Sequence, residues 1–250
     1  VARLPAPLLD ETVAILALLD VTALKRAEQL RADFVANASH ELKTPLASLM
    51  GFIETLRGPA RDDAEARVRF LAIMQEQADR MARLVEDLLS LSRIEMQEHM
   101  PPTSTADLRA VLEGVVDALD MRADRRGMTL VLQTADLPPV LGERDELAQV
   151  FQNLVDNAIK YGRPNSAVTI QARTLGPDEE RSGRLGRPAV AVAISDQGEG
   201  IAREPLPRLT ERFYRVDTAR SREMGGTGLG LAIVKHIVNR HRGLLEIDSE

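Results

Sequence analysis

The sequence predicts an α plus α/β fold in which a long helical hairpin comes before an α/β domain. Two segments with helical spacing of apolar residues, 25–57 and 64–98, are separated by a short charged turn that begins at Gly58 and Pro59. Prolines at positions 101 and 102 stop the second segment. Alternating strand and helix patterns follow, so the second half of the chain reads as an α/β domain.

The first helix carries a histidine on the side away from its apolar face. Steps of three and four residues mark that face, which comprises Leu30, Phe34, Ala38, Leu42, Leu46, Leu49, Ile53 and Leu56. His40 lies two residues from its nearest members on either side, so at about 100° per residue it projects roughly opposite them. A core histidine would not stand there.

The neighbours of His40 decide how this histidine is interpreted. A lone helical histidine is most often a solvated surface residue, but Glu41 follows it directly and Thr44 lies one turn later on the same face. Pro45 removes a backbone donor and predicts a kink just beyond. An exposed imidazole beside a carboxylate and a bend is typical of a nucleophile site.

The second helix has a heptad seam that predicts a homodimer. Leu71, Met74, Ala78, Met81, Val85 and Leu88 alternate steps of three and four, while Leu84 and Leu91 widen the stripe. One hairpin cannot bury so much apolar surface alone. Two hairpins would bury it as a four-helix bundle.

Composition excludes several classes of function. The net charge of -6 with interspersed signs argues against nucleic acid as a partner, and the absence of cysteine excludes disulfides and thiolate metal sites. No signal peptide or membrane span is visible, and Val13–Leu19 is so short that we expect a buried strand there. The chain begins without methionine, so we expect a fragment, a cytoplasmic portion whose attachment to a membrane would require an upstream segment.

The α/β part alternates its elements in the order helix, strand, helix, strand, strand, helix and strand. We expect helices at 107–121, 143–161 and 229–241, and strands at 128–133, 168–173, 189–194 and 244–248. The segment 175–187 reads as an exposed excursion between two strands. The segment 202–226 is too long for an ordinary loop, and we interpret it as a lid.

The helix at 143–161 carries a polar stripe opposite its apolar side. Asn153, Asn157, Lys160 and Tyr161 fall on one face, which must meet either solvent or a ligand. Two amides one turn apart followed by a lysine suit hydrated Mg²⁺ and phosphate oxygens, and the tyrosine suits a purine. For any single one of these residues, a solvated face is an equally good interpretation.

Two glycine-containing turns are candidates for contact with the same ligand. Asp196–Gly200 follows a strand, where Gly198 and Gly200 permit a tight turn and the aspartate can accept a hydrogen bond from an exocyclic amine. The loop from Gly226 to Gly230 leads into a helix, and amides at a helix N-terminus bind anions. Its spacing fits neither the dinucleotide fingerprint nor the Walker A loop, and a flexible hinge is the competing interpretation.

A short aromatic cluster lies inside the lid. Residues 211–215 hold Phe213 and Tyr214 in a chain with only seven Phe and Tyr in total. We expect Phe213 to fix the base of the lid through hydrophobic packing. Arg215 would reach a terminal phosphate when the lid closes.

Taken together, these motifs resemble those of sensor histidine kinases of two-component signalling, and phosphate-regulon sensor kinases in particular. His40–Leu46 resembles the phosphoacceptor box of that family, and the other boxes follow in the family's order. They are the N box at 153–161, the G1 box at 196–200, the F box at 211–215 and the G2 box at 226–230. Residues 15–28 are similar to the end of a PAS sensor domain.

The resemblance implies a domain order and a nucleotide site. Residues 1–24 would be the PAS-like edge and linker, 25–100 the dimerisation and phosphotransfer domain, 101–106 a linker, and 107–250 a Bergerat-type α/β sandwich that binds ATP. Asn157 would hold Mg²⁺ and Asp196 the adenine amino group. The full implied ATP-binding set is Asn153, Asn157, Lys160, Tyr161, Asp196, Gly198, Gly200, Arg215, Gly226, Thr227, Gly228, Leu229 and Gly230.

The resemblance also implies the chemistry and the partners. His40 would attack the γ-phosphorus of ATP with Glu41 as general base, and phosphohistidine would donate to an aspartate of a response regulator receiver domain. Thr44 would orient water for the reverse, phosphatase reaction. Two alternatives remain: a gyrase, Hsp90 and MutL type ATPase, against which the box around His40 argues, and a catalytically silent nucleotide-binding dimerisation scaffold.

Overall fold

The computed structural model describes residues 2–3, 14–15, 19–176, 179, 185–186, 188–217 and 224–249. By its contacts the chain divides into two compact units, Val1–Ala47 and Ser48–Glu250. The division falls inside the first helix, two residues after Pro45. No helix among the described residues combines the length and the apolar character needed to cross a membrane.

Two long helices form the first part of the chain, as predicted. Helix α1 spans Thr22–Arg57 and α2 spans Ala64–Gln97. Asp63 starts α2, because its side chain accepts a hydrogen bond from the Ala66 amide at 2.9 Å and satisfies a donor that the helix leaves open. Near the turn Phe52 packs against Phe70, with ring centroids 5.1 Å apart.

The apolar faces of both helices are only partly covered. In α1, Leu46 and Ile53 are exposed although the spacing predicted a buried face. In α2, Leu71 is 51% exposed and Val85 43% exposed. The buried positions are instead Ala66, Leu84, Leu91 and Ile94. The last three lie toward the C-terminal end of α2, which packs against α7; the heptad seam therefore stays largely open in the single chain.

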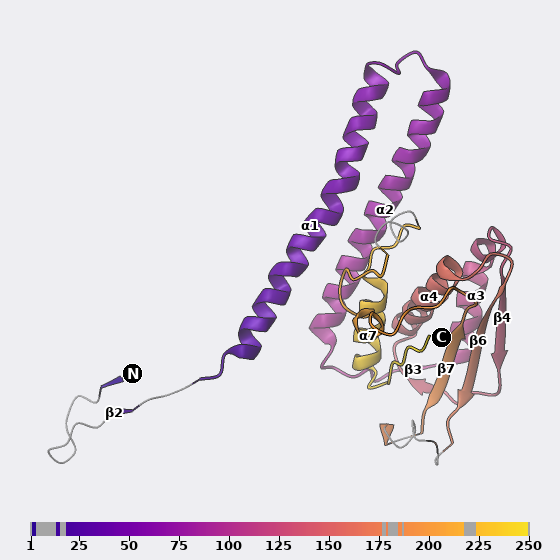
Figure 1. Cartoon of the computed structure of the whole chain (residues 1–250). Coiled ribbons are helices and arrows are strands. Elements are labelled where there is room, and N and C mark those ends of the chain that lie inside the picture. The colour runs from indigo at the N-terminus through magenta and orange to yellow at the C-terminus, as the bar shows by residue number, and fades with distance from the viewer. Residues whose placement is uncertain are drawn as a thin grey trace. The chain divides into compact units, whose positions relative to one another are not determined.

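In the residues that the structure describes, the α/β part contains a three-stranded sheet and the helices α3, α4 and α7 (Figure 1). The strands β4 (Thr129–Thr134), β6 (Ala167–Thr174) and β7 (Val190–Ser195) lie in the order β4-β6-β7, with β4 parallel and β7 antiparallel to β6. A small pair, β3 (Thr105–Ala106) with β5 (Val140–Leu141), accompanies them. Near the start, β1 (Ala2–Arg3) pairs with β2 (Ala14–Ile15).

Helices α3 (Leu108–Asp124) and α4 (Arg144–Tyr161) pack against each other and cover the sheet, and α4 also contacts α7 (Gly230–Arg240), as Figure 1 shows. Alternation along β6 creates the contact surface, because Val168 and Ile170 are buried while Gln171 is exposed. The helices contribute the other half of this core, with Val155, Ile159, Ile233 and Ile237 among the fully buried side chains. The α/β sandwich expected from the resemblance is confirmed.

The strand expected at 244–248 is wrong. These residues form no strand in the structure. The hydrogen bond that ties this end of the chain runs from the Ile201 amide to the Ser249 hydroxyl at 2.7 Å, and a strand requires a ladder of backbone bonds instead. The spacing of apolar residues does not show whether a neighbouring strand is available for pairing.

Three other expectations fall partly on residues outside the described ranges. Of Val13–Leu19, Ala14 and Ile15 form β2, and Leu19 is exposed rather than buried. The excursion at 175–187 connects the antiparallel strands β6 and β7, and the lid contains the short 3-10 helix η1 (Leu206–Arg208). Residues 16–18, most of 177–187, and 218–223 lie outside the described part of the chain.

Candidate nucleotide-binding site

The amide stripe of α4 meets the start of α7. Asn153 donates from Nδ2 to the Gln149 carbonyl at 2.9 Å, which fixes the amide orientation. Its Oδ1 then faces Gly230, where an added Cβ would come within 2.6 Å of that oxygen. Asn157 is half-buried one turn later. A side chain at the first position of α7 would therefore displace the Asn153 amide.

The end of α4 carries charged groups that are already partnered. Lys160 Nζ lies 2.7 Å from Asp156 Oδ2, and the same carboxylate lies 2.5 Å from Arg122. Lys160, which the sequence predicts to contact phosphate, is thus paired with an aspartate one turn before it. Tyr161 is 38% exposed at the end of the helix.

Arg126 holds the C-terminal end of α4, and the sequence analysis missed it. Its guanidinium donates to the carbonyls of Ile159 and Lys160, and to that of Gly162 at 3.2 Å. A cation at this end of a helix is favoured because the last carbonyls lack partners there. The only sequence signal was an arginine in the turn between a helix and a strand.

The turn after β7 lies against this same end of α4. The Asp196 carboxylate accepts a hydrogen bond from the Gly198 amide at 2.7 Å. A Cβ at Gly198 would come within 2.9 Å of the Tyr161 carbonyl, and Gly200 has a φ of +75°. The structure therefore brings the predicted G1 turn and the polar end of α4 together, with the close approach at Gly198.

The glycine-rich loop before α7 is joined to the predicted lid. The Phe213 amide donates to the Gly228 carbonyl at 2.8 Å, and Gly228 has a φ of +75°. A Cβ at Gly228 would approach Phe213 Cα to 2.9 Å and Arg215 Nε to 3.2 Å. Phe213 thus fixes this segment through its backbone, and Arg215 lies against the loop. Leu229 is fully buried, so only its backbone can face a ligand.

Helix α2 also contacts the glycine-rich loop, which the sequence did not predict. Thr227 Oγ1 donates to Asp87 Oδ2 at 2.7 Å and accepts from the Leu229 amide at 3.3 Å. Burial raises the pKa of the Asp87 carboxyl above its ordinary 3.8, although the Thr227 hydroxyl and the Lys160 ammonium act in the opposite direction. Near the loop's start a Cβ at Gly225 would meet Arg83 Nη2 at 2.9 Å.

Further along, α2 is joined to the rest of the site by polar contacts. Ser90 and the Gln149 side chain are linked by hydrogen bonds of 2.7 and 3.0 Å. Arg212, in the segment predicted as a lid, lies 2.5 Å from Glu95. His236 Nδ1 of α7 lies 2.9 Å from Glu98 Oε2. Burial would raise the pKa of Glu98, but hydrogen bonds from His236 and Asn239 outweigh it and lower the pKa below its ordinary 4.5.

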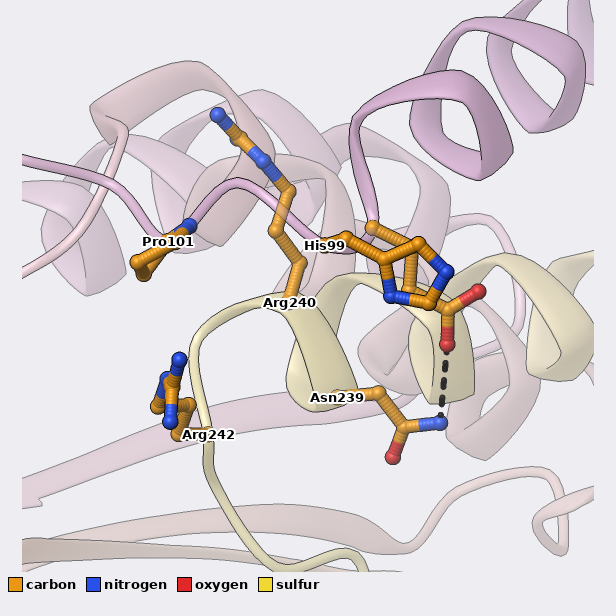
Figure 2. Close-up of a pocket in the computed structure, with 6 residues that line it drawn as sticks. His99, Pro101, Asn239, Arg240 and Arg242 are labelled. Atoms are coloured by element: carbon orange, nitrogen blue, oxygen red, sulfur yellow. Dashed lines mark hydrogen bonds between the residues drawn. The ribbon is translucent and has the colours of Figure 1, made fainter.

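A polar pocket of about 290 Å³ opens where α2 and α7 end (Figure 2). It is lined by Glu98, His99, Pro101, Asn239, Arg240 and Arg242. Arg240 is buried and reaches Glu146 at 2.5 Å and the Met100 carbonyl at 3.0 Å. None of the residues predicted to bind nucleotide lines this pocket, and the Arg240 contacts join α7 to Met100 and to Glu146 of α4.

The predicted phosphoacceptor segment lies in the other compact unit, where its local geometry is well defined. His40 is exposed, Glu41 is half-buried and Pro45 is buried. Thr44 Oγ1 donates to the His40 carbonyl at 3.2 Å, one turn back along the helix. Helix α1 continues through Pro45, and the kink stays a prediction.

The predicted ligands fit the described residues. Gly198, Gly228 and Gly230 form close approaches that a Cβ would block, and the start of α7 offers backbone amides to phosphate. No group of three or more His, Asp or Glu residues in the described ranges is arranged to hold a metal. A magnesium ion here would therefore take most of its oxygen ligands from phosphates and water, with an amide such as that of Asn157.

Two family models match the chain. Residues 30–97 match the His Kinase A (phospho-acceptor) domain, and residues 142–250 match the histidine kinase-, DNA gyrase B-, and HSP90-like ATPase domain. The first match contains His40, and the second contains α4, the Asp196 turn and the glycine-rich loop.

Curated relatives and solved structures agree with these matches. The phosphate regulon sensor protein PhoR of Pseudomonas aeruginosa is 40% identical over 92% of this chain and 49% of its own length. The sensor-like histidine kinase SenX3 of Mycolicibacterium smegmatis is 36% identical over 96% of this chain and 60% of its own. The histidine kinase AdeS of Acinetobacter baumannii is 29% identical, with a TM-score of 0.58 over 80% of this chain and 86% of that one. The chain thus spans about half to three fifths of the length of these two curated relatives.

Proposed function

The chain belongs to the sensor histidine kinase family, and from that premise we propose that it phosphorylates His40 with ATP. One observation carries the proposal. The α4 amides, the lid segment and the glycine-rich loop meet through the contacts of Asn153 with Gly230 and of Phe213 with Gly228. These are contacts between the predicted boxes, and they form around backbone amides that suit phosphate.

In the proposed complex the adenine lies at the Asp196 turn and the phosphates at the glycine-rich loop. Asp196 accepts a hydrogen bond from the adenine amino group, and Tyr161, exposed at the same end of α4, lies beside the base. Gly198 and Gly200 let the turn approach the ring. The phosphates take the amides of the loop, with Asn153, Asn157, Lys160 and Arg215 around them; the loop residues are Gly226, Thr227, Gly228, Leu229 and Gly230.

The proposed reaction is an in-line phosphoryl transfer. A ring nitrogen of His40 forms a bond to the γ-phosphorus as the bond to the β,γ-bridging oxygen breaks, and ADP leaves. Glu41 takes the proton from the other ring nitrogen as positive charge develops. Lys160 and Arg215 offset the negative charge of the transferring group, and a Mg²⁺ ion held by Asn157 would supply further positive charge there.

The same proposal covers the partners and the reverse reaction. Phosphohistidine donates its phosphoryl group to an aspartate of a response regulator receiver domain. Thr44, which lies one turn from His40, orients water for removal of phosphate from that regulator. The open seam on α2 supports a homodimer, and we place this portion of the protein in the cytoplasm.

Incubation with γ-labelled ATP and Mg²⁺ tests the proposal. Wild type should acquire an acid-labile, alkali-stable label, which His40→Ala and Asn157→Ala should lose. Asn157→Ala should also lose nucleotide affinity, whereas His40→Ala should keep it. Label that persists in His40→Ala would refute the site assignment, and nucleotide binding or hydrolysis without any label would indicate the silent scaffold or the ATPase.

A further inference from the structure

We infer that the Asp87 carboxylate of α2 occupies the anion position of the glycine-rich loop, so that α2 and a nucleotide phosphate compete for the same donors. The inference rests on the proposed function, because it assigns those donors a second, internal partner. It concerns a residue of the helix that follows the phosphoacceptor helix, outside all five predicted boxes.

The groups around Asp87 are those that bind phosphate. Thr227 donates its hydroxyl to Asp87 Oδ2 at 2.7 Å, and the Lys160 ammonium and the Arg83 guanidinium are close enough to favour the charged carboxylate. Thr227 and Lys160 both belong to the proposed phosphate set. A carboxylate that receives a hydroxyl donor and two cations therefore substitutes locally for a phosphate oxygen.

Helix α2 presents this carboxylate as part of a continuous contact. One turn earlier, Arg83 lies against Gly225 at the beginning of the loop. One turn later, Ser90 is hydrogen-bonded to Gln149 of α4, and Leu91 is fully buried. Asp87 is thus held in register by its neighbours on both sides, and it is not an exposed side chain that meets the loop by chance.

The Asp87 side chain is half-buried; its burial raises the pKa of the carboxyl, whereas the Thr227 hydroxyl and the Lys160 and Arg83 cations act in the opposite direction. When a phosphate takes the Thr227 hydroxyl, Asp87 loses its donor and α2 loses its hold on the loop.

Antagonism of this kind is reciprocal. If docking of α2 weakens nucleotide binding, bound nucleotide weakens docking by the same factor. Loading of the glycine-rich loop then frees α2 from it.

Nucleotide affinity of the full chain tests the inference. Asp87→Asn keeps the size of the side chain and an oxygen that accepts from Thr227, but removes the charge. We expect it to bind ATP about tenfold more tightly than wild type by titration calorimetry, because the negative charge that competes with phosphate for the Thr227 hydroxyl and the Lys160 ammonium is gone. Asp79→Asn is the matched control, because Asp79 is exposed on the same helix and should leave the affinity unchanged.

Hydrogen exchange of the backbone amides of α2 provides the second readout. In wild type, saturating ATP should increase exchange in the part of α2 around Asp87. Unchanged or weaker affinity in Asp87→Asn, with wild-type binding intact, would overturn the inference. Absence of ATP binding in wild type as well would instead refute the proposed function.

Discussion

At the scale of single residues, the site depends on glycines whose missing side chains make room for a neighbour. Gly228 combines a φ of +75° with a contact that a Cβ would bring to 2.9 Å from Phe213 Cα. The obstacle is backbone, so no rotamer change relieves it. Gly114 offers the opposite case, because it lies in the middle of α3 with nothing within 4 Å of an added Cβ.

Gly228→Ala should therefore destabilise the protein and weaken nucleotide binding. A left-handed alanine costs about 1–2 kcal/mol, and the contact with Phe213 adds to it. Gly114→Ala should instead stabilise by roughly 0.5–1 kcal/mol, the gain expected for alanine in a helix interior. Urea unfolding and ATP titration of both variants check this; equal behaviour of the two would contradict the role assigned to Gly228.

At the scale of elements, α2 and α7 are joined by groups that titrate. Glu98 accepts hydrogen bonds from His236 and from Asn239, at 2.9 and 3.3 Å respectively, and its pKa is lowered below 4.5. A lowered pKa in the folded state means that ionised Glu98 stabilises the fold above pH 4.5. That contribution is lost as the pH falls below 4.5 and through the folded-state pKa.

Glu98→Gln should consequently flatten the acid limb of the stability curve. The free energy of unfolding of wild type should fall more steeply than that of the variant as the pH drops below about 4.5. The raised pKa of Asp87 changes the stability in the opposite direction as the pH falls. Wild type and Glu98→Gln are therefore compared at each pH, because both contain Asp87. Parallel curves from urea unfolding at successive pH values would show that Glu98 carries no such contribution.

The element scale also shows what the sequence predicts well. Helix α2 begins at the predicted residue, where Asp63 caps it, and α4 begins within one residue of the prediction. The strand expected at 244–248 fails because an apolar pattern does not reveal whether a neighbouring strand is available. Local signals therefore predict where elements begin, whereas pairing depends on distant parts of the chain.

In the candidate site too, local features were predicted from the sequence and contacts between distant residues were not. The glycine turns were identified because glycine has a local conformational signature, confirmed by the φ of Gly200 and Gly228. The contacts of Arg126 with the end of α4 and of Asp87 with Thr227 were missed, because each joins residues more than 30 positions apart. Side chains that act through such contacts leave no pattern in a single sequence.

At the scale of the whole molecule, the open seam of α2 is the main surface that the single chain leaves unexplained. Leu71 is 51% exposed, although it stands on the heptad seam with Val85. Ala72 is also exposed and lies beside it, off the seam. The two positions therefore separate the effect of a charge on the seam from that of a charge elsewhere on the same helix.

Leu71→Asp should convert the proposed homodimer into a monomer, whereas Ala72→Asp should leave it intact. An aspartate on the seam would have to be buried without a partner in the four-helix bundle, at a cost of several kcal/mol. Each 1.4 kcal/mol weakens association by about tenfold, so the variant should sediment as a monomer at micromolar concentration. A wild type that is itself monomeric there, or a Leu71→Asp protein that remains dimeric, would show that this seam does not hold two chains together.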